Sequence, residues 1–238
     1  MSTEHIVSSF DRDLEGIQAK VMRMGGLVEE ALRNAVRALE DGDLDLARVV
    51  RHGDKAIDAL NEEIRSQTAQ LLALRAPTAI DLRLVLSVMA ISASLERIGD
   101  YAKNIAKRTP TVADATKING SIGSLRQMTQ FVIRMISDAL DAYIQHDTDL
   151  AEDVFERDRE ADQMYNMLFR ALLTHMMEDH RNIATGMHLH FIAKNIERAG
   201  DHATTIAEQT IYMVTGSAPD DDRPKGDTTP LTTSGEPA

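Results

Sequence analysis

The sequence predicts an all-α protein built as two tandem, pseudo-symmetric three-helix bundles, with six long antiparallel helices. Three observations lead to this prediction. The 238 residues include only 13 Gly, 6 Pro and 4% aromatic residues, which favours long helices over a β-sandwich or barrel. Apolar residues recur with a helical period from residue 10 to about residue 213. A motif of the first half also returns in the second half.

Three apolar series predict the helices of the first half, and they span residues 10–38, 46–74 and 84–105. The first series ends at a turn signal, Asp41-Gly42-Asp43. The second ends at Ala76-Pro77-Thr78, because proline disfavours helix at the residue before it. The third is predicted to close at Thr109-Pro110. The first bundle is therefore assigned to residues 1–110.

Three further series predict the helices of the second half, and they span residues 125–142, 150–175 and 189–213. Residues 146–149 form a turn, and a second break falls at 178–182. Residues 111–123 have no strong period and contain Asn119-Gly120, so we interpret them as a linker. The second bundle is assigned to 124–214. The tail at 215–238 is rich in Pro, Gly, Ser and Thr and is predicted to be disordered.

Composition and charge exclude several classes of function. The chain has no cysteine, so disulfides, zinc–thiolate sites and cysteine nucleophiles are excluded. With 26 Lys and Arg against 38 Asp and Glu, the net charge is −12, which disfavours nucleic acid and anionic lipid as direct partners. Cations or basic protein surfaces are the partners that such a charge favours. Neither a signal peptide nor a membrane span is recognisable, so we expect a cytoplasmic protein.

An internal repeat relates the two halves. Residues 96–106 match 197–207 at an offset of 101 residues, with seven of eleven positions identical. The aspartates at 54 and 58 match those at 158 and 162 at an offset of 104 residues, and the three-residue difference indicates a shorter loop in the second half. We infer a duplication of one three-helix unit.

Each half contains two acidic pairs with a spacing of four residues, which places both members on one helix face. The phase of these pairs relative to the apolar stripe is the same in both halves. It places Glu96 and Asp100 outside the core. Four repulsive pairs at matching places predict a hard-cation site in each half, formed by Asp54, Asp58, Glu96 and Asp100, and by Asp158, Asp162, Glu197 and Asp201.

Clustered carboxylates suit iron, manganese, magnesium or calcium. The alternative is a solvated acidic face that forms ion pairs with Arg97, Lys103 and Arg198. Gly99 and Gly200, beside the acids, suggest that a backbone or ligand approaches closely.

The motifs expected of an enzyme are missing from the sequence. A di-iron oxidase of the bundle type would have Glu-x-x-His on its helices, but His202 follows Glu197 by five residues and no histidine follows Glu96. His188 and His190 lie two residues apart on a predicted helix, so they cannot chelate one ion together. We predict a non-enzymatic protein. A carboxylate-ligated metal hydrolase or oxidase and a plain helical scaffold remain as alternatives.

The segments LERIGDYAKNIAKR and IERAGDHATTIAEQ resemble the doubled signature of the PhoU family, and the resemblance covers about residues 10–214. It implies two similar three-helix bundles with metal ions, often iron clusters, on the repeated acidic faces. The family positions match Glu96, Asp100, Glu197 and Asp201, with Asp54, Asp58, Asp158 and Asp162 from the preceding helices.

The resemblance also implies a role as a negative regulator of the phosphate-starvation response. The implied partners are the ATPase subunit of a phosphate ABC transporter and a membrane sensor histidine kinase, so contact with the membrane would be indirect. A second apolar face on the third predicted helix, with Leu82, Val85, Leu86 and Met89, needs cover. Packing between the bundles or a homodimer would supply it, and we expect a homodimer.

Overall fold

The structure is a computed structural model that describes residues 3–75, 80–115, 118 and 120–218. These residues form six α-helices and one short 3₁₀ helix, and none of them lies in a strand. The helices are α1 (Thr3–Asp41), α2 (Leu44–Arg75), α3 (Ile80–Ala113), α4 (Ser121–Gln145), α5 (Thr148–Glu178) and α6 (Ile183–Thr215), with the 3₁₀ helix η1 (His180–Asn182) before α6. The all-α prediction is therefore confirmed.

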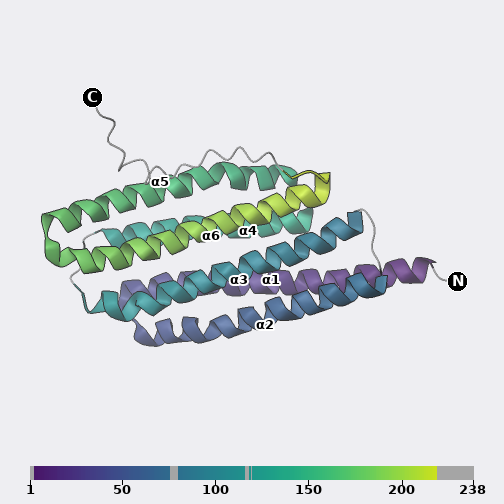
Figure 1. Cartoon of the computed structure of the whole chain (residues 1–238), viewed down its shortest axis with the longest axis horizontal. Coiled ribbons are helices and arrows are strands. Elements are labelled where there is room, and N and C mark those ends of the chain that lie inside the picture. Colours follow the sequence, from purple (N-terminus) through teal and green to yellow (C-terminus); the bar gives the residue numbers. More distant parts are fainter. Residues whose placement is uncertain (1–2, 76–79, 116–117, 119, 219–238) are drawn as a thin grey trace, which may run out of the picture.

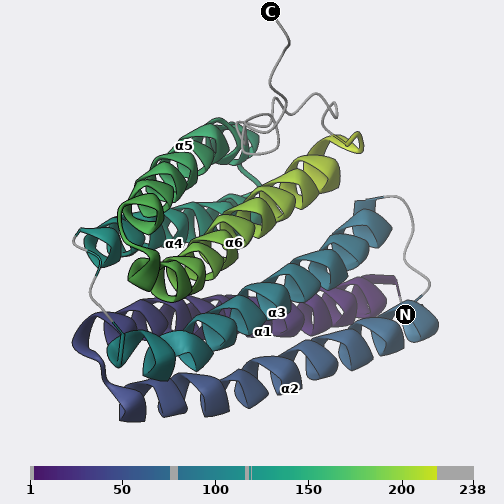
Figure 2. The same cartoon turned by 60° about the vertical axis from the view of Figure 1, so that its left-hand side comes forward.

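The helices form two groups of three, α1–α3 and α4–α6, that lie side by side (Figures 1 and 2). The predicted turn after the first helix is confirmed, since α1 ends at Asp41 and Gly42 adopts a φ of 66°. The turn before α5 is also confirmed, because Asp147 caps the helix by accepting a hydrogen bond from the Leu150 amide at 3.0 Å. The break at 178–182 contains the end of α5 and η1.

Antiparallel packing of α3 against α6 joins the two halves at the centre of the molecule (Figure 2). Ser87 Oγ donates to the Gln209 carbonyl at 3.3 Å near one end of this seam. Near the other end, Arg108 contacts His188 at 3.3 Å. The 101-residue offset maps 87 onto 188 and 108 onto 209, so the two contacts are related by the pseudo-two-fold symmetry.

The two halves share one hydrophobic core rather than two separate cores, because their buried apolar residues form a single contiguous cluster. Helix α1 packs on α4 as a second contact between the halves. Gly25 permits this contact, since a Cβ at that position would collide with the Leu140 side chain. The bundles are thus fused across α1–α4 and α3–α6.

Several helices extend beyond the spans of the predicted apolar series. Helix α1 begins at Thr3 rather than near residue 10, because 3–9 contains no helix breaker even though it lacks the apolar period. Helix α3 continues three residues beyond Pro110, and burial of Val112 holds this last turn in place. Helix α4 begins four residues before Leu125 and directly after Gly120, whose φ is 79°. The predicted stop at 76–78 and the tail from 219 onward lie outside the described residues.

The second apolar face of α3 is only partly covered within the chain. Val85 is fully buried in the shared core, and Met89 is partly buried. Leu82 and Leu86 remain exposed. The homodimer expected from this face stays a prediction.

Candidate metal-binding faces

The structure brings the predicted carboxylates together in two groups. Those of α2 and α3 form the first acidic face, which consists of Asp54, Asp58, Glu96 and Asp100, and the charges of these four groups act on one another. Those of α5 and α6 form the second acidic face, which consists of Asp158, Asp162, Glu197 and Asp201, and the charges of Asp162 and Asp201 act on Glu197. The repeat therefore places a matching set of acids in each half.

Close contact between neighbouring helices holds each face together. In the first half, a Cβ on Gly99 would lie 3.0 Å from Ile57 Cδ1 and 3.7 Å from Asp54 Oδ1. In the second half, a Cβ on Gly200 would lie 4.0 Å from Asp158 Oδ1. Gly99 thus lets α2 bring Asp54 close to the acids of α3, whereas at Gly200 a Cβ would be in ordinary contact with its neighbours. The close approach predicted beside the acids is therefore found at Gly99 alone of the two glycines, and it comes from side chains of α2.

Burial of the acids differs between the faces, which the shared sequence phase did not predict. Asp54 is 4% exposed and Asp58 is exposed, whereas Asp162 is 6% exposed and Asp158 is half-buried. Glu197 is 5% exposed. These values depend on how each helix is rotated against its neighbours, and the period along one helix contains no information about that rotation.

Lys103 pairs with two of the four acids of the first acidic face. Its ammonium donates to Asp54 Oδ2 and lies 3.5 Å from Asp100 Oδ1. Arg97 lies 3.7 Å from Glu96 and 3.9 Å from Asp100 at the exposed edge. The ion pairs weighed as the alternative to a metal site are therefore present here. Asp54 Oδ1 is nevertheless buried without a hydrogen-bond partner.

In the second acidic face, a different lysine forms the ion pair. Lys194 donates to Glu197 Oε1 at 2.6 Å, and its ammonium lies 5.0 Å from the centre of the Tyr165 ring. Thr204 occupies the position that corresponds to Lys103 and donates to the Asp201 carbonyl at 2.6 Å. Sequence reasoning missed Lys194, although its spacing of three residues before Glu197 is a recognisable ion-pair signal. Glu197 Oε2 is buried without a hydrogen-bond partner.

Loss of hydration shifts three of these acids, Asp58, Glu96 and Glu197, toward their protonated forms. It raises the pKa of Asp58, whose side chain is only partly covered, and the charge of Asp54 adds to the effect. It also raises the pKa of Glu96, with a further contribution from Asp100. The largest shift is at Glu197, where burial raises the pKa to about 7 despite the hydrogen bond from Lys194.

The donor chemistry of both faces fits a hard cation. Oxygen ligands from carboxylates suit iron, manganese or magnesium, and each face has one buried carboxylate oxygen that lacks a partner. Among the described residues, no three acidic or histidine side chains already stand in position around one point. A bound cation would therefore displace Lys103 from the first face and a proton from Glu197 in the second.

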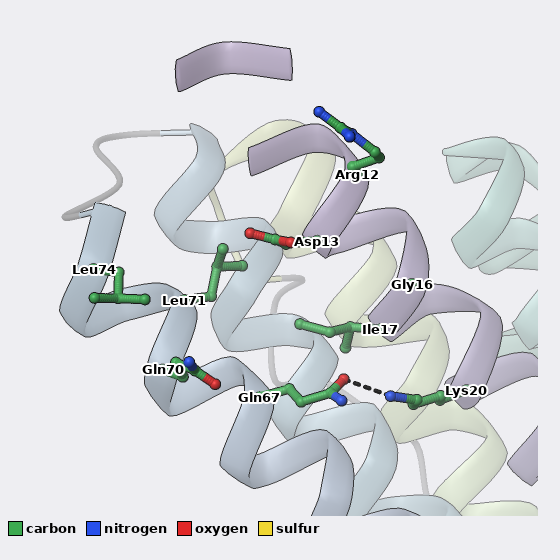
Figure 3. A pocket seen from close by; sticks show the side chains of 9 residues that line it. All are labelled: Arg12, Asp13, Gly16, Ile17, Lys20, Gln67, Gln70, Leu71 and Leu74. Carbon is green, nitrogen blue, oxygen red and sulfur yellow. Dashed lines mark hydrogen bonds between the residues drawn. The ribbon is translucent and has the colours of Figure 1, made fainter. Parts of the chain in front are cut away.

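A pocket on the first half lies away from both acidic faces. It lies between α1 and α2, has a volume of about 340 Å³ and is lined by Arg12, Asp13, Gly16, Ile17, Lys20, Gln67, Gln70, Leu71 and Leu74 (Figure 3). Its amine, Lys20, is already bound to Gln67 and Glu63, each at 2.7 Å. None of the residues that line this pocket belongs to either acidic face.

Comparison with known proteins identifies the family. The PhoU domain matches residues 21–109 and 125–210, one match in each half. This chain belongs to the PhoU family. The two matches contain the two acidic faces, so the resemblance noted in the sequence is confirmed.

PhoU relatives match along almost the whole chain. The phosphate-specific transport system accessory protein PhoU homolog of Rhizobium meliloti is 42% identical and is matched over 96% of this chain and 97% of that protein. The protein of the same name from Zymomonas mobilis is 47% identical over 89% of each chain. The relatives are named as accessory proteins and not as enzymes, in agreement with the non-enzymatic prediction.

Solved PhoU structures share the fold. The crystal structure of PhoU from Pseudomonas aeruginosa superposes with a TM-score of 0.84 at 38% identity, covering 87% of this chain and all of that one. The phosphate transport system regulatory protein PhoU from Streptococcus pneumoniae has a TM-score of 0.82 at 30% identity, covering 89% and 99% of the two chains. Within the described part of this PhoU protein, no helix is long and apolar enough to cross a membrane.

Proposed function

We propose that this chain represses the phosphate-starvation response when phosphate is plentiful and modulates phosphate uptake. It acts as a metal-bearing adaptor between the ATPase subunit of a phosphate ABC transporter and a sensor histidine kinase. The observation that carries the regulatory role is the match to named PhoU accessory proteins along nearly the whole chain. Any approach to the membrane is through these partners.

The two acidic faces support the metal-bearing part of this proposal. Each face combines four carboxylates from two helices, and each buries an oxygen that has no hydrogen-bond partner. A divalent or trivalent cation would satisfy these oxygens and neutralise charges that otherwise raise the pKa of their neighbours. When bound, such a cation stiffens the contact of α2 with α3 and of α5 with α6, because its ligands come from both helices.

The regulatory role is tested with a phosphate-starvation reporter, such as alkaline phosphatase activity. In a strain that lacks this gene, we expect high activity during growth in ample phosphate. The wild-type gene should restore low activity. Activity that stays low in the deletion strain would contradict the proposed repression.

The metal role is tested by removing charge from the faces without changing side-chain size. The test variant combines Glu96→Gln and Asp100→Asn with Glu197→Gln and Asp201→Asn. The matched control combines Glu152→Gln and Glu156→Gln, an exposed acidic pair on α5 with the same spacing of four residues. We expect manganese or iron bound to the purified test variant to fall below half of the wild-type amount, while the control keeps its metal. Equal metal content in all three proteins would contradict the assignment.

A further inference from the structure

A pocket with a basic lining lies at one end of the α3–α6 seam. Its volume is about 280 Å³, which is room for several water molecules, and it is lined by Asn104, Lys107, Arg108, Thr111 and His188. We call this the basic pocket. Residues 104, 107, 108 and 111 share one face of α3 by their spacing of three and four, and His188 comes from α6.

The pocket lies in an acid-free part of a strongly acidic chain. Residues 101–113 contain Lys103, Lys107 and Arg108 but no Asp or Glu. Residues 180–196, which lead into and form the first half of α6, also contain no Asp or Glu. In a protein of net charge −12, the lining of this pocket thus contains two basic residues, Lys107 and Arg108, and no acid.

Arg108 is held in place without an acidic partner. Its Nη1 donates to His188 Nδ1 at 3.3 Å, and its guanidinium lies 4.8 Å from the centre of the Phe191 ring. Its Nε is buried and has no hydrogen-bond acceptor. Among the described residues, no carboxylate forms an ion pair with Arg108 or Lys107. The guanidinium is thus oriented in advance at the pocket, and its charge is not balanced by an ion pair with any described residue.

The contact with Arg108 also determines the tautomer of His188. A guanidinium can only donate, so Nδ1 of the neutral ring must be the acceptor. The ring proton therefore lies on Nε2, which makes His188 a further hydrogen-bond donor at the pocket.

The fold does not require basic residues at this place. At the pseudo-symmetric end of the seam, Glu208 and Gln209 stand where Lys107 and Arg108 stand here, and Ser87 replaces His188. That end forms the same helix contact through the Ser87 hydrogen bond to the Gln209 carbonyl. Lys107 and Arg108 are also not explained by attraction to the negative end of the α3 dipole. That attraction is limited to the last turn of a helix, and the last turn of α3 has no basic residue.

We propose that the basic pocket binds a tetrahedral oxyanion, either free inorganic phosphate or the phosphoryl group of a small phosphomonoester. Arg108 supplies a planar fork of donors that matches phosphate oxygens, and Lys107 adds a second positive charge. The Thr111 hydroxyl, the Asn104 amide and the His188 ring supply neutral donors. Binding of the anion does not depend on the proposed function. Only a role of this binding in regulation rests on the proposed function.

Isothermal titration of the purified full-length protein with inorganic phosphate tests the pocket, with ionic strength held constant. We expect saturable binding to the wild-type protein and a loss of affinity of about tenfold or more in Arg108→Gln, the size typical for a hydrogen-bonded charge. Arg48→Gln removes one charge from an exposed site on α2 and should bind like the wild type. Arg108→Lys, which keeps the charge but loses the fork, should lie between the two.

Lys107→Gln is the second test variant, and it keeps the test valid if Arg108→Gln does not fold. Lys107 is exposed, so its replacement should leave the unfolding temperature unchanged while weakening phosphate binding severalfold. In NMR spectra of the wild type, phosphate should shift the ring resonances of His188. Absence of saturable binding, or equal affinities of wild type, Arg108→Gln and Lys107→Gln, would overturn the proposal.

Phosphoserine as a second titrant separates the two sources of the anion. Tighter binding of inorganic phosphate assigns the pocket to the free ion, and tighter binding of phosphoserine assigns it to a phosphomonoester. Failure of this inference is distinguishable from failure of the proposed function. A protein that represses the reporter but binds neither titrant refutes the pocket alone, whereas one that binds phosphate but leaves the reporter unchanged refutes the regulatory role alone.

Discussion

The two acidic faces have the same number of carboxylates at matching positions, yet they balance the charge in different ways. In the first face, the Lys103 ammonium lies between the two helices and contacts Asp54 and Asp100. In the second face, Lys194 pairs with Glu197, and the burial of Glu197 raises its pKa to about 7. Duplication thus preserved the acids, while each copy acquired its own lysine.

This difference implies two different competitors for a cation. A metal ion at the first face, as proposed above, would compete with a side-chain ammonium, which is charged at all physiological pH values. A metal ion at the second face would compete in part with a proton on Glu197, so its affinity would rise with pH up to about 7. Under the proposed function, the two halves of one chain would therefore differ in metal occupancy under the same conditions.

The largest expected effect is at Glu197. Its pKa is raised from 4.5 to about 7 in the folded protein, so the folded state binds more protons than the unfolded state between these pH values. The free energy of unfolding therefore falls as pH rises from about 4.5 to about 7. We expect Glu197→Gln to be more stable than wild type by about 3 kcal/mol at pH 8 and nearly equal to it at pH 4.5.

Urea denaturation across this pH range measures the effect. Glu96→Gln, the same change at the matching position of the first half, is the control. Glu96 is 26% exposed, so its pH-dependent gain should be smaller. Parallel pH profiles of wild type and Glu197→Gln would contradict the assignment of the raised pKa to Glu197.

A second effect is expected when the first face loses its lysine. In Lys103→Met, the buried Asp54 loses its charged donor, and we expect a loss of about 2 kcal/mol in the free energy of unfolding. Adding Asp54→Asn removes the uncompensated charge and should restore most of this loss. A double-mutant cycle by urea denaturation gives the coupling, and strictly additive effects of the two changes would show that the pair is not coupled.

The smallest effect concerns the two glycines beside the faces. Gly200→Ala should stabilise the protein by up to about 1 kcal/mol, because alanine is the better helix former and the new Cβ would have no neighbour nearer than 3.6 Å. Gly99→Ala should gain less, since its Cβ would lie 3.0 Å and 3.2 Å from two carbons of Ile57, which must move. Thermal unfolding of both variants tests the order, and a larger gain for Gly99→Ala would reverse it.

Much of the fold followed from local patterns in the sequence. The helical period predicted all six helices, since a long helix must bury one continuous stripe whatever it packs against. Helix ends were less predictable, as the continuation of α3 beyond Pro110 shows. That turn depends on the burial of Val112, which only the packed structure reveals.

The candidate sites also differ in how far the sequence predicted them. The repeat located the acids of both faces, because spacing of four residues on a helix is a local property. The basic pocket joins Arg108 to His188, which lie 80 residues apart in the chain. The acid-free segments were visible in the sequence, but their meeting depends on the antiparallel register of α3 and α6.

The sequence by itself determined the helical class, the duplication and the carboxylates that each half presents, since all three depend on composition, period and spacing along the chain. Only the tertiary structure decided which acid is buried in each half, which lysine pairs with it and how Arg108 comes to contact His188. Burial and charge pairing depend on the rotation of each helix against its neighbours. That rotation is determined by packing across the whole shared core.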